Sequence, residues 1–277
     1  MKVCIIGLGL IGGSLALSLK KLPFINEIYG IDHNIEHQSK AIKYNLVDKI
    51  IDFKEIKEID IIILAIPVNG ILSIMKQLDE KIKETATIID LGSTKETIVK
   101  NIPANIRENF VAAHPMTGNE HSGPDAAIEG LYNDKVVVLC NFEQSGKLQQ
   151  EIAVRIFSGI HMNIIYMDAH KHDRHAAFIS HMPHIISYSI ANTVLRQEDK
   201  HNILSMAAGG FRSMSRLANS SPNMWEDIFK QNKDNVLNAI DIFQIELDSL
   251  KKSIKNEEWD DVYMKIDNGN KLKDIFS

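Results

Sequence analysis

The stretch "CIIGLGLIGGS", residues 4–14, determines the fold prediction for this chain. Its glycines Gly7, Gly9 and Gly12 stand in the G-x-G-x-x-G spacing, after a predicted strand at residues 2–6 and at the start of an apolar helix. The first glycine permits a tight turn, the second lets backbone approach a pyrophosphate, and the third lets helix and strand pack closely. The helix N-terminus offers unpaired N–H groups to phosphates. The pattern therefore predicts a dinucleotide site.

An acidic residue stands where such a site needs one. A second predicted strand, residues 27–31, is followed by Asp32, twenty positions after Gly12. A carboxylate at this place accepts hydrogen bonds from an adenosine ribose. It would repel a 2′-phosphate, and no arginine follows it, so NAD is favoured over NADP. The alternative is a glycine turn that binds no ligand.

The first 168 residues alternate short apolar runs with amphipathic segments. Several runs are nearly continuous in Ile and Val, which is typical of strands covered on both faces in a parallel sheet. The βαβ order predicts the α/β class, with a doubly wound, mainly parallel Rossmann-type domain over residues 1–168. The predicted strands are residues 2–6, 27–31, 60–66, 86–91, 110–113, 135–140 and 163–167.

Helical patterns alone follow, so residues 169–277 are predicted to form an all-α substrate and dimerisation domain. A long helix is interrupted by Pro183, which is expected to kink it. A second long helix is predicted from Pro222 towards Ile254, with Ser221 as its N-cap. An apolar stripe along it favours pairing of two copies as a homodimer, the alternative being that it covers the first domain. The stripe consists of Val236, Ile240, Phe243, Leu247, Leu250 and Ile254.

Composition narrows the class of protein. The chain has 277 residues, 44% of them hydrophobic, which fits a globular protein with room for two cores. A formal charge of −5 argues against a nucleic-acid partner. No apolar run is long enough to cross a bilayer, and the start of the chain is typical of a strand and not of a signal peptide. Cys4 and Cys140 lie in apolar runs, so buried free thiols and a cytoplasmic location are expected.

The segment "FVAAHPMTGNEHSG", residues 110–123, ends a predicted strand in His114. Pro115 cannot donate to a sheet, so the imidazole is expected to be presented at the rim and not buried. Ligands of such sheets lie beyond the carboxyl ends of the strands. A histidine at a strand end is usually structural, but a nicotinamide nearby favours catalysis. The cofactor is expected to contact Gly7, Gly9, Leu10, Ile11, Gly12, Asp32, Ala65, Pro67 and Ser93.

The helical half supplies further polar groups. His181 and His184 share one helical face beside the kink at Pro183, which predicts a pocket wall. His170 and His172 are interpreted as a solvated helix start. No matching carboxylate or cysteine spacing accompanies these histidines, so no metal site is predicted.

Two arginines follow, Arg212 and Arg216, four positions apart. Arginine forks match carboxylates with two hydrogen bonds, which suits an anionic substrate. The alternative for each is a surface salt bridge.

Taken together, these segments resemble the prephenate dehydrogenase family. The segments that carry the resemblance, in order, are "GLGLIGGS", "AIPV", "DLGSTK", "HPMTGNEHSG", "SHMPH", "GFRSMSRLA" and "NMWEDIF". The resemblance implies a Rossmann domain, a helical dimerisation domain and an active site between them. It also implies NAD-dependent oxidative decarboxylation of prephenate to 4-hydroxyphenylpyruvate in tyrosine biosynthesis.

The resemblance also implies roles for single residues. His114 matches the catalytic histidine, and Ser93 matches the serine that orients the substrate hydroxyl and the nicotinamide. Arg216 matches the arginine that binds a carboxylate. One departure is Ser213, where many members have an aspartate that would hold this arginine. The remaining substrate-binding matches are His181, His184, Glu120 and Trp225.

Other activities stay open at this point. An arogenate or dual-specificity cyclohexadienyl dehydrogenase would share every motif. A β-hydroxyacid dehydrogenase would need a catalytic lysine where this chain has histidines. A non-catalytic NAD-sensing protein would bind the cofactor without turnover. The chain length leaves no room for a fused mutase or regulatory domain, so none is expected.

Overall fold

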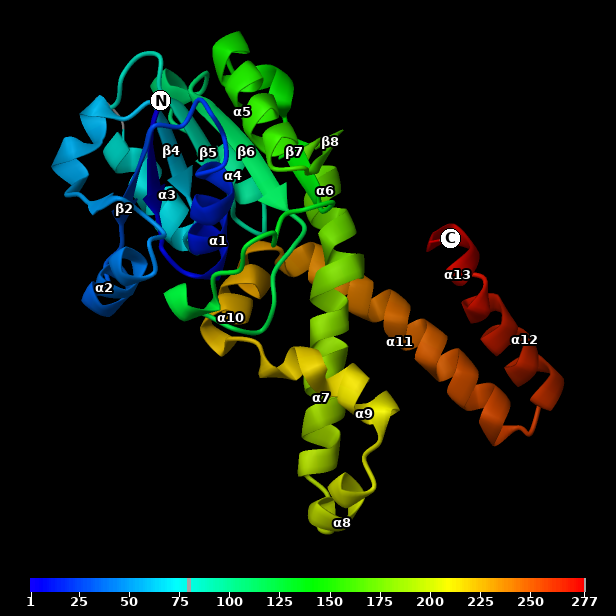
Figure 1. Ribbon diagram of the computed structural model, residues 1–277. Coiled ribbons are helices and arrows are strands. Elements are labelled where there is room, and N and C mark those ends of the chain that lie inside the picture. Colours follow the sequence, from blue (N-terminus) through cyan, green and yellow to red (C-terminus); the bar gives the residue numbers. More distant parts are fainter. Residues whose placement is uncertain (79–80, 277) are drawn as a thin grey trace. The chain divides into compact units, whose positions relative to one another are not determined.

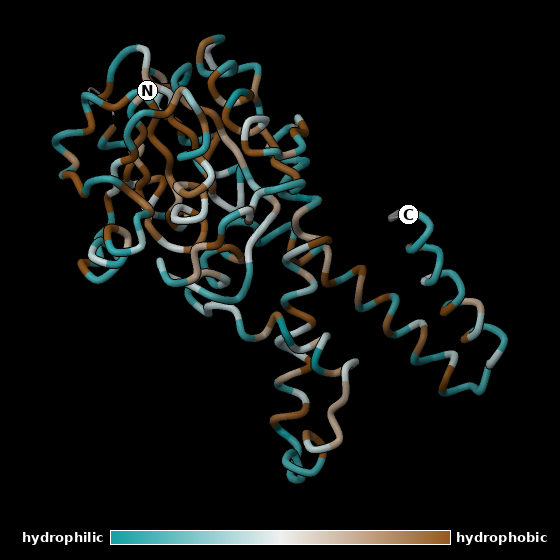
Figure 2. Tube along the Cα trace, viewed as in Figure 1, coloured by the Kyte–Doolittle hydropathy of each residue, from teal (hydrophilic) through white to brown (hydrophobic). Residues whose placement is uncertain are grey.

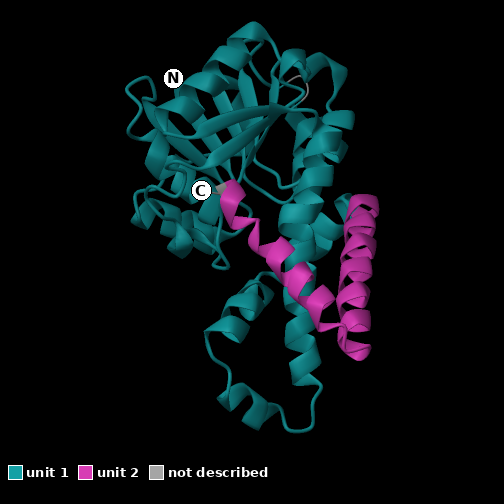
Figure 3. Ribbon diagram, turned by 90° about the vertical axis from the view of Figure 1, so that its right-hand side faces the viewer, with its two compact units in different colours: residues 1–232 teal, residues 233–277 magenta. Residues whose placement is uncertain are grey.

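The computed structural model describes residues 1–78 and 81–276. The chain divides into two compact units, residues 1–232 and residues 233–277 (Figure 3). Among the described residues, unit 1 contains all the strands and also the first helices of the predicted helical region, while unit 2 consists of helices and the turns between them.

Unit 1 is built on an eight-stranded sheet in the order β3-β2-β1-β4-β5-β6-β7-β8 (Figure 1). Neighbouring strands are parallel except β6 and β7, which are antiparallel. The predicted doubly wound α/β fold is confirmed, and so are all seven predicted strands; β3 was missed because two residues show no periodicity. The strands are β1 Lys2–Ile6, β2 Glu27–Ile31, β3 Lys49–Ile50, β4 Ile61–Leu64, β5 Thr87–Asp90, β6 Phe110–Pro115, β7 Val136–Cys140 and β8 Asn163–Met167.

Alternate residues of the central strands enter two separate cores. In β1, Val3 and Ile5 join the core that holds side chains of α1, α2 and α5, whereas Cys4 and Ile6 join the core that holds those of α3 and α4. Burial on both faces is the reason for the continuous apolar runs, which are brown in Figure 2. Cys4 and Cys140 are buried and free, as predicted. These helices are α1 Leu10–Leu19, α2 Ile35–Lys43, α3 Val68–Leu78, α4 Glu96–Lys100 and α5 Lys147–Gly159.

The helical part of unit 1 begins with a column of α6, η5 and α7 that Figure 1 shows without a break. The expected disturbance by Pro183 takes the form of η5, a π-helical turn over Ala177–His181. Since proline has no N–H, the backbone just before it widens by one residue, and such turns often occur at functional sites. The helices are α6 Ala169–Ala176, α7 Met182–Leu195, α8 Lys200–Ser205, α9 Gly209–Ser215 and α10 Pro222–Gln231.

Short 3-10 segments complete unit 1. They are η1 Phe53–Glu58, η2 Ala104–Ile106, η3 Pro124–Ala126, η4 Phe142–Gln144 and η6 Arg216–Asn219.

The prediction of one continuous helix from Pro222 to Ile254 is wrong. The helix α10 ends at Gln231, and Asn232 leaves the helical region with φ −117° and ψ 29°. The side chain of Asn232 is buried in hydrogen bonds within unit 1, which no periodic pattern reveals. The start at Ser221 and Pro222 is confirmed, although the Ser221 hydroxyl makes no capping hydrogen bond.

Unit 2 is a helical hairpin in which α11 packs against α12. The chain turns at Glu257, whose φ of 57° is left-handed. Of the predicted stripe, Val236 is buried, while Leu247 and Ile254 are 52% and 49% exposed. None of the helices in the described residues is long and apolar enough to cross a membrane. The helices of unit 2 are α11 Lys233–Lys255, α12 Trp259–Asn270 and α13 Lys273–Phe276.

Candidate active site

The glycine turn between β1 and α1 has the shape that a pyrophosphate requires. Gly7 has φ +96°, and a β-carbon there would collide with the carbonyl of Ala65. A β-carbon on Gly12 would collide with the carbonyl of Gly7. Gly9 differs, because the nearest atom to its β-carbon position is the backbone nitrogen of Gly123 at 4.0 Å. The space above Gly9 and the helix N-terminus behind it therefore suit the phosphates of a dinucleotide.

Asp32, directly after β2, is held beside this turn. Its side chain is only 5% exposed, and its Oδ2 accepts a hydrogen bond of 2.9 Å from the backbone N–H of Leu8. Its Oδ1 accepts one of 2.9 Å from the N–H of Asn34. Each carboxylate oxygen can accept a further hydrogen bond, as the ribose hydroxyls of NAD would require.

The loops after β4 and β5 reach the same edge of the sheet. Ala65 and Pro67 lie between β4 and α3, and the half-buried Ser93 lies in the loop between β5 and α4. In that loop the buried ammonium of Lys95 forms an ion pair with Asp90 and donates a 2.8 Å hydrogen bond to the carbonyl of Ala113. Burial raises the pKa of Asp90, and the ammonium of Lys95 opposes this rise. This contact ties the end of β5 to β6 next to His114.

The imidazole of His114 was expected to lie at the rim of the sheet without being buried, but it is half-buried. Its strand continues through Pro115, because the antiparallel neighbour β7 pairs with both residues. Its Nδ1 lies 2.8 Å from Nε2 of His172, with the two rings at 69°. Burial lowers the pKa of His114 well below its ordinary 6.5, helped by His172, Lys95 and His181. The imidazole is therefore neutral at physiological pH.

The interpretation of His172 as a solvated residue is wrong, whereas His170 is exposed as expected. His172 is 3% exposed, and its Nδ1 lies 2.7 Å from Oδ1 of Asp173. The sequence contained a signal for this burial, because Ala169 and Ala176 share the helical face of His172. The polar residues around these alanines made this buried face difficult to recognise in the sequence.

Asp173 connects three elements of unit 1. Its Oδ1 accepts a 2.7 Å hydrogen bond from the N–H of Lys95, and its Oδ2 accepts one of 2.9 Å from the N–H of Glu96. Its carbonyl accepts a 2.6 Å hydrogen bond from Nδ2 of Asn232, which lies 3.1 Å from Nδ1 of His181. Sequence reasoning assigned no role to Asp173, Lys95 or Asn232.

The rings of the two predicted pocket histidines, His181 and His184, both contact the ring of Trp225. His184 stacks on its ring at 3.6 Å between centroids, and His181 meets it edge-on at 5.9 Å. Burial lowers the pKa of His181 to about 4. Trp225 is 6% exposed, and among the described residues its Nε1 has no hydrogen-bond acceptor. This buried indole N–H is therefore a donor without a partner in the described part of the protein.

Arg216, at the start of η6, pairs with Glu120 at 3.3 Å. Arg216 therefore has an acidic partner from a segment far away in the sequence. Arg212 is engaged differently, because its Nε donates a 3.3 Å hydrogen bond to the carbonyl of Ala207. The side chain of Arg216 is 57% exposed and can reorient towards an anion.

The loop that carries Glu120 is docked on the cofactor helix α1. The hydroxyl of Tyr132 donates a 2.7 Å hydrogen bond to the carbonyl of Ile11, and the N–H of Ile128 donates one of 2.9 Å to Oγ of Ser14. The loop therefore joins the glycine turn to the segment that follows His114.

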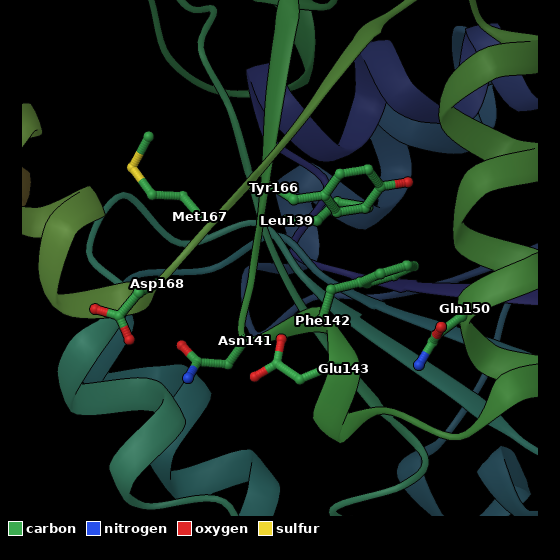
Figure 4. Close-up of a pocket in the computed structure, with 8 residues that line it drawn as sticks. All are labelled: Leu139, Asn141, Phe142, Glu143, Gln150, Tyr166, Met167 and Asp168. Carbon is green, nitrogen blue, oxygen red and sulfur yellow. The ribbon is translucent and has the colours of Figure 1, made fainter.

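A separate hollow of about 550 Å³ lies beside β7 and β8 (Figure 4). The rings of Phe142 and Tyr166 meet there at 5.1 Å. Its polar groups are occupied, since Asp168 caps α6 and Asn141 accepts a hydrogen bond from the N–H of Ala169. None of the predicted site residues lines it, so this hollow is not the candidate site.

Comparison with known proteins agrees with this arrangement. Residues 15–166 match the family described as prephenate dehydrogenase, nucleotide-binding domain. Residues 168–267 match the family described as prephenate dehydrogenase, dimerization domain. The two matches cover most of the chain.

Relatives along the whole chain give the same result. Prephenate dehydrogenase of Bacillus subtilis (strain 168) is 33% identical over 94% of this chain and 72% of its own length. Cyclohexadienyl dehydrogenase of Zymomonas mobilis is 30% identical over 93% of this chain and 90% of its own length. The crystal structure of prephenate dehydrogenase from A. aeolicus, in complex with hydroxyphenyl propionate and NAD+, superposes with a TM-score of 0.93 at 30% identity, over 100% of this chain and 98% of that one. The chain described here belongs to the prephenate dehydrogenase family.

Proposed function

We propose that this protein is an NAD-dependent prephenate dehydrogenase, which oxidatively decarboxylates prephenate to 4-hydroxyphenylpyruvate for tyrosine biosynthesis. One observation carries the proposal beyond family membership. An unbroken series of contacts links His114 through His172, Asp173 and Asn232 to His181, and from there to Trp225. The base, the pocket histidines and the indole are thereby assembled within one unit.

The cofactor part of the proposal rests on the glycine turn and on Asp32. The open space above Gly9 and the carboxylate of Asp32 beside it fit a dinucleotide with free ribose hydroxyls. NAD, when bound, accepts a hydride from the ring carbon that bears the hydroxyl group. The residues that would hold it are Gly7, Gly9, Leu10, Ile11, Gly12, Asp32, Ala65, Pro67 and Ser93.

His114 would act as the base. A neutral imidazole accepts the proton of the substrate hydroxyl while hydride leaves the ring carbon that bears this hydroxyl. The low pKa of His114 keeps its imidazole neutral. Ser93, on the neighbouring loop, would orient the hydroxyl. Loss of carbon dioxide from the opposite ring carbon makes the product ring aromatic, so the reaction is effectively irreversible.

Arg216 would bind a substrate carboxylate with its two-pronged guanidinium. Glu120 must then share the guanidinium or release it, so this carboxylate would compete with the substrate for Arg216. The unpaired Nε1–H of Trp225 offers a further donor, and the stacked His184 fixes the plane of the indole.

The deciding experiment follows NADH formation with prephenate and with arogenate, each with NAD and with NADP. Prephenate with NAD is expected to give the highest kcat/KM. The His114→Asn variant should lose roughly 10²–10⁴ in kcat while still binding substrate, because only the proton acceptor is removed. His175→Asn is the matched control, since His175 is exposed on helix α6.

Three outcomes would change the proposal. A higher kcat/KM with arogenate would make the protein an arogenate or dual-specificity cyclohexadienyl dehydrogenase. NAD binding without turnover of either substrate would indicate a non-catalytic sensor. An unchanged kcat in His114→Asn would remove His114 from the mechanism.

We also propose a homodimer that forms through the helical region, with residues 1–168 as the cofactor domain and residues 169–277 as the substrate and dimerisation domain. The match of residues 168–267 to a dimerization domain supports this assembly. The two free buried thiols support a cytoplasmic location.

A further inference from the structure

The contact between His114 and His172 raises a question that the proposed function leaves open. A base needs a ring nitrogen without a proton, and a neutral imidazole has one such nitrogen and one N–H. Nδ1 of His114 faces His172, so Nε2 is the nitrogen left for the substrate. The orientation of the hydrogen bonds behind His114 therefore decides whether it can act as a base.

We propose that His172 and Asp173 are positioning residues that hold His114 in its Nδ1–H tautomer, so that Nε2 carries the lone pair that receives the substrate proton. This inference rests on the proposed function for its kinetic consequence but not for its structural content.

The direction of each hydrogen bond follows from the carboxylate end of the chain of contacts. Asp173 accepts from the N–H groups of Lys95 and Glu96, which fixes both of its oxygens. A carboxylate can only accept, so Nδ1 of His172, 2.7 Å away, must donate. In a neutral His172 the nitrogen Nε2 then carries a lone pair. His114 must donate its Nδ1–H to that lone pair across 2.8 Å.

The protonation state of His172 decides the direction of its hydrogen bond with His114. A doubly protonated His172 would donate from Nε2 and force His114 to accept at Nδ1. Nε2 of His114 would then carry the hydrogen, and the base would be lost. The tautomer of His114 therefore reports directly on whether the proposal is right.

The same contacts serve the step itself. The hydroxyl proton moves to Nε2 of His114 while the Nδ1 proton stays between the two imidazoles. The resulting imidazolium remains hydrogen-bonded to His172, whose opposite nitrogen is bound to the carboxylate of Asp173. This arrangement of base, orienting group and carboxylate follows the logic of a catalytic triad, with a second imidazole inserted.

A kinetic comparison tests the role of His172. His172→Leu removes the acceptor of the Nδ1–H, so kcat should fall roughly 10²–10⁴-fold, as it does when a catalytic histidine adopts the wrong tautomer. KM for prephenate and Kd for NAD should stay within about threefold. His172→Gln places an amide oxygen near the position of Nε2 and should recover at least about tenfold in kcat over the leucine variant. His175→Leu, on the same helix, should leave kcat unchanged.

The proposal would fail if His172→Leu kept the parental kcat. It would also fail if the glutamine and leucine variants lost kcat equally, or if the loss appeared in KM alone, because each result is that of a purely structural residue.

A spectroscopic measurement tests the tautomer without turnover. The protein labelled with ¹⁵N-histidine is recorded with NAD bound, and the ring signals of His114 are identified by their loss in His114→Asn. In the parent, Nδ1 should carry the hydrogen and Nε2 should not, while His172→Gln should keep this state. An Nε2–H form of His114 in the parent would overturn the proposal. Failure to turn over prephenate or arogenate would instead refute the proposed function and leave the tautomer result standing.

Discussion

Arg216 is the residue on which binding of the negatively charged substrate is expected to depend. Within the described residues Arg216 forms an ion pair with Glu120, and this contact contributes little to stability because solvent screens it. Arg216→Ala should therefore leave the unfolding midpoint unchanged. It should lower kcat/KM for prephenate by an amount that corresponds to about 2–5 kcal/mol of lost transition-state stabilisation, since a substrate carboxylate loses its partner. Steady-state kinetics alongside urea unfolding measure both effects.

Arg212→Ala is the matched control for this prediction. Arg212 lies four positions earlier and is bound to the carbonyl of Ala207. If the loss in kcat/KM followed Arg212→Ala and not Arg216→Ala, the assignment of the carboxylate-binding arginine would be wrong.

His181 predicts how stability depends on pH. Burial lowers its pKa from 6.5 to about 4 in the folded protein. As pH falls below 6.5, His181 binds a proton in the unfolded chain but not in the folded protein. The free energy of unfolding therefore decreases until about pH 4. The decrease attributable to His181 is about 3 kcal/mol.

Urea unfolding between pH 4 and 7 measures this decrease. His181→Asn keeps an acceptor near Asn232 and removes the titrating ring, so its unfolding free energy should fall less steeply with acid than that of the parent. Equal slopes in the two proteins would show that His181 is not the group responsible.

Single site residues could be predicted from the sequence where they belong to a recognisable motif. A series of contacts connects His114, His181, His184 and Trp225, whereas Arg216 pairs with Glu120. His172 and Asp173 were missed because their burial depends on which face of α6 meets α4, a tertiary fact that a polar run of letters conceals.

The glycine turn of β1 and α1 allows two substitutions with opposite consequences for stability. Gly12→Ala places a methyl group into the carbonyl of Gly7, so it should destabilise the fold by about 1–3 kcal/mol and also weaken NAD binding. Gly9→Ala meets no protein atom closer than 4.0 Å, so it should fold normally but bind NAD at least about tenfold more weakly, because the methyl group occupies the approach of the pyrophosphate.

Thermal unfolding and titration with NAD distinguish the two variants. Gly210→Ala is the control, since no atom lies within 4 Å of a β-carbon placed there. Normal NAD affinity in Gly9→Ala would place the cofactor somewhere other than above this turn.

Elements were predicted best where their periodicity is strong and worst where a local event interrupts them. The central strands matched because both of their faces are buried, and the more exposed β8 matched because its apolar run is short and continuous. The form of the π-turn was not predicted, because a proline that lacks an N–H can either kink a helix or widen it. The end of α10 at Asn232 was not predicted, because it depends on a hydrogen bond to the distant Asp173.

The whole molecule is expected to be a dimer because unit 2 cannot bury its own apolar surface. In α11 and α12 the exposed apolar residues are Leu237, Ile242, Ile245, Leu247, Ile254, Trp259, Tyr263, Met264 and Ile266. Monomeric proteins seldom expose so many large apolar side chains on two neighbouring helices. Leu247→Lys should raise the dimer dissociation constant at least about 100-fold, because a charge would be buried at the interface.

Sedimentation velocity over a dilution series measures this constant. Gln244→Lys adds the same charge at an exposed polar position of the same helix and should leave the dimer intact. A monomeric parent protein, or equal effects of the two substitutions, would contradict the proposed assembly.

By itself the sequence determined the fold class, the cofactor turn and the identity of the residues in the motifs, because these depend on local spacing and on burial that repeats along an element. Only the tertiary structure decided the partners of those residues. The pairing of His114 with His172, the pairing of Arg216 with Glu120 and the break at Asn232 all depend on segments far apart in the chain. Spacing along a chain carries no record of such contacts, because they arise only when separate elements pack and bury their polar groups together.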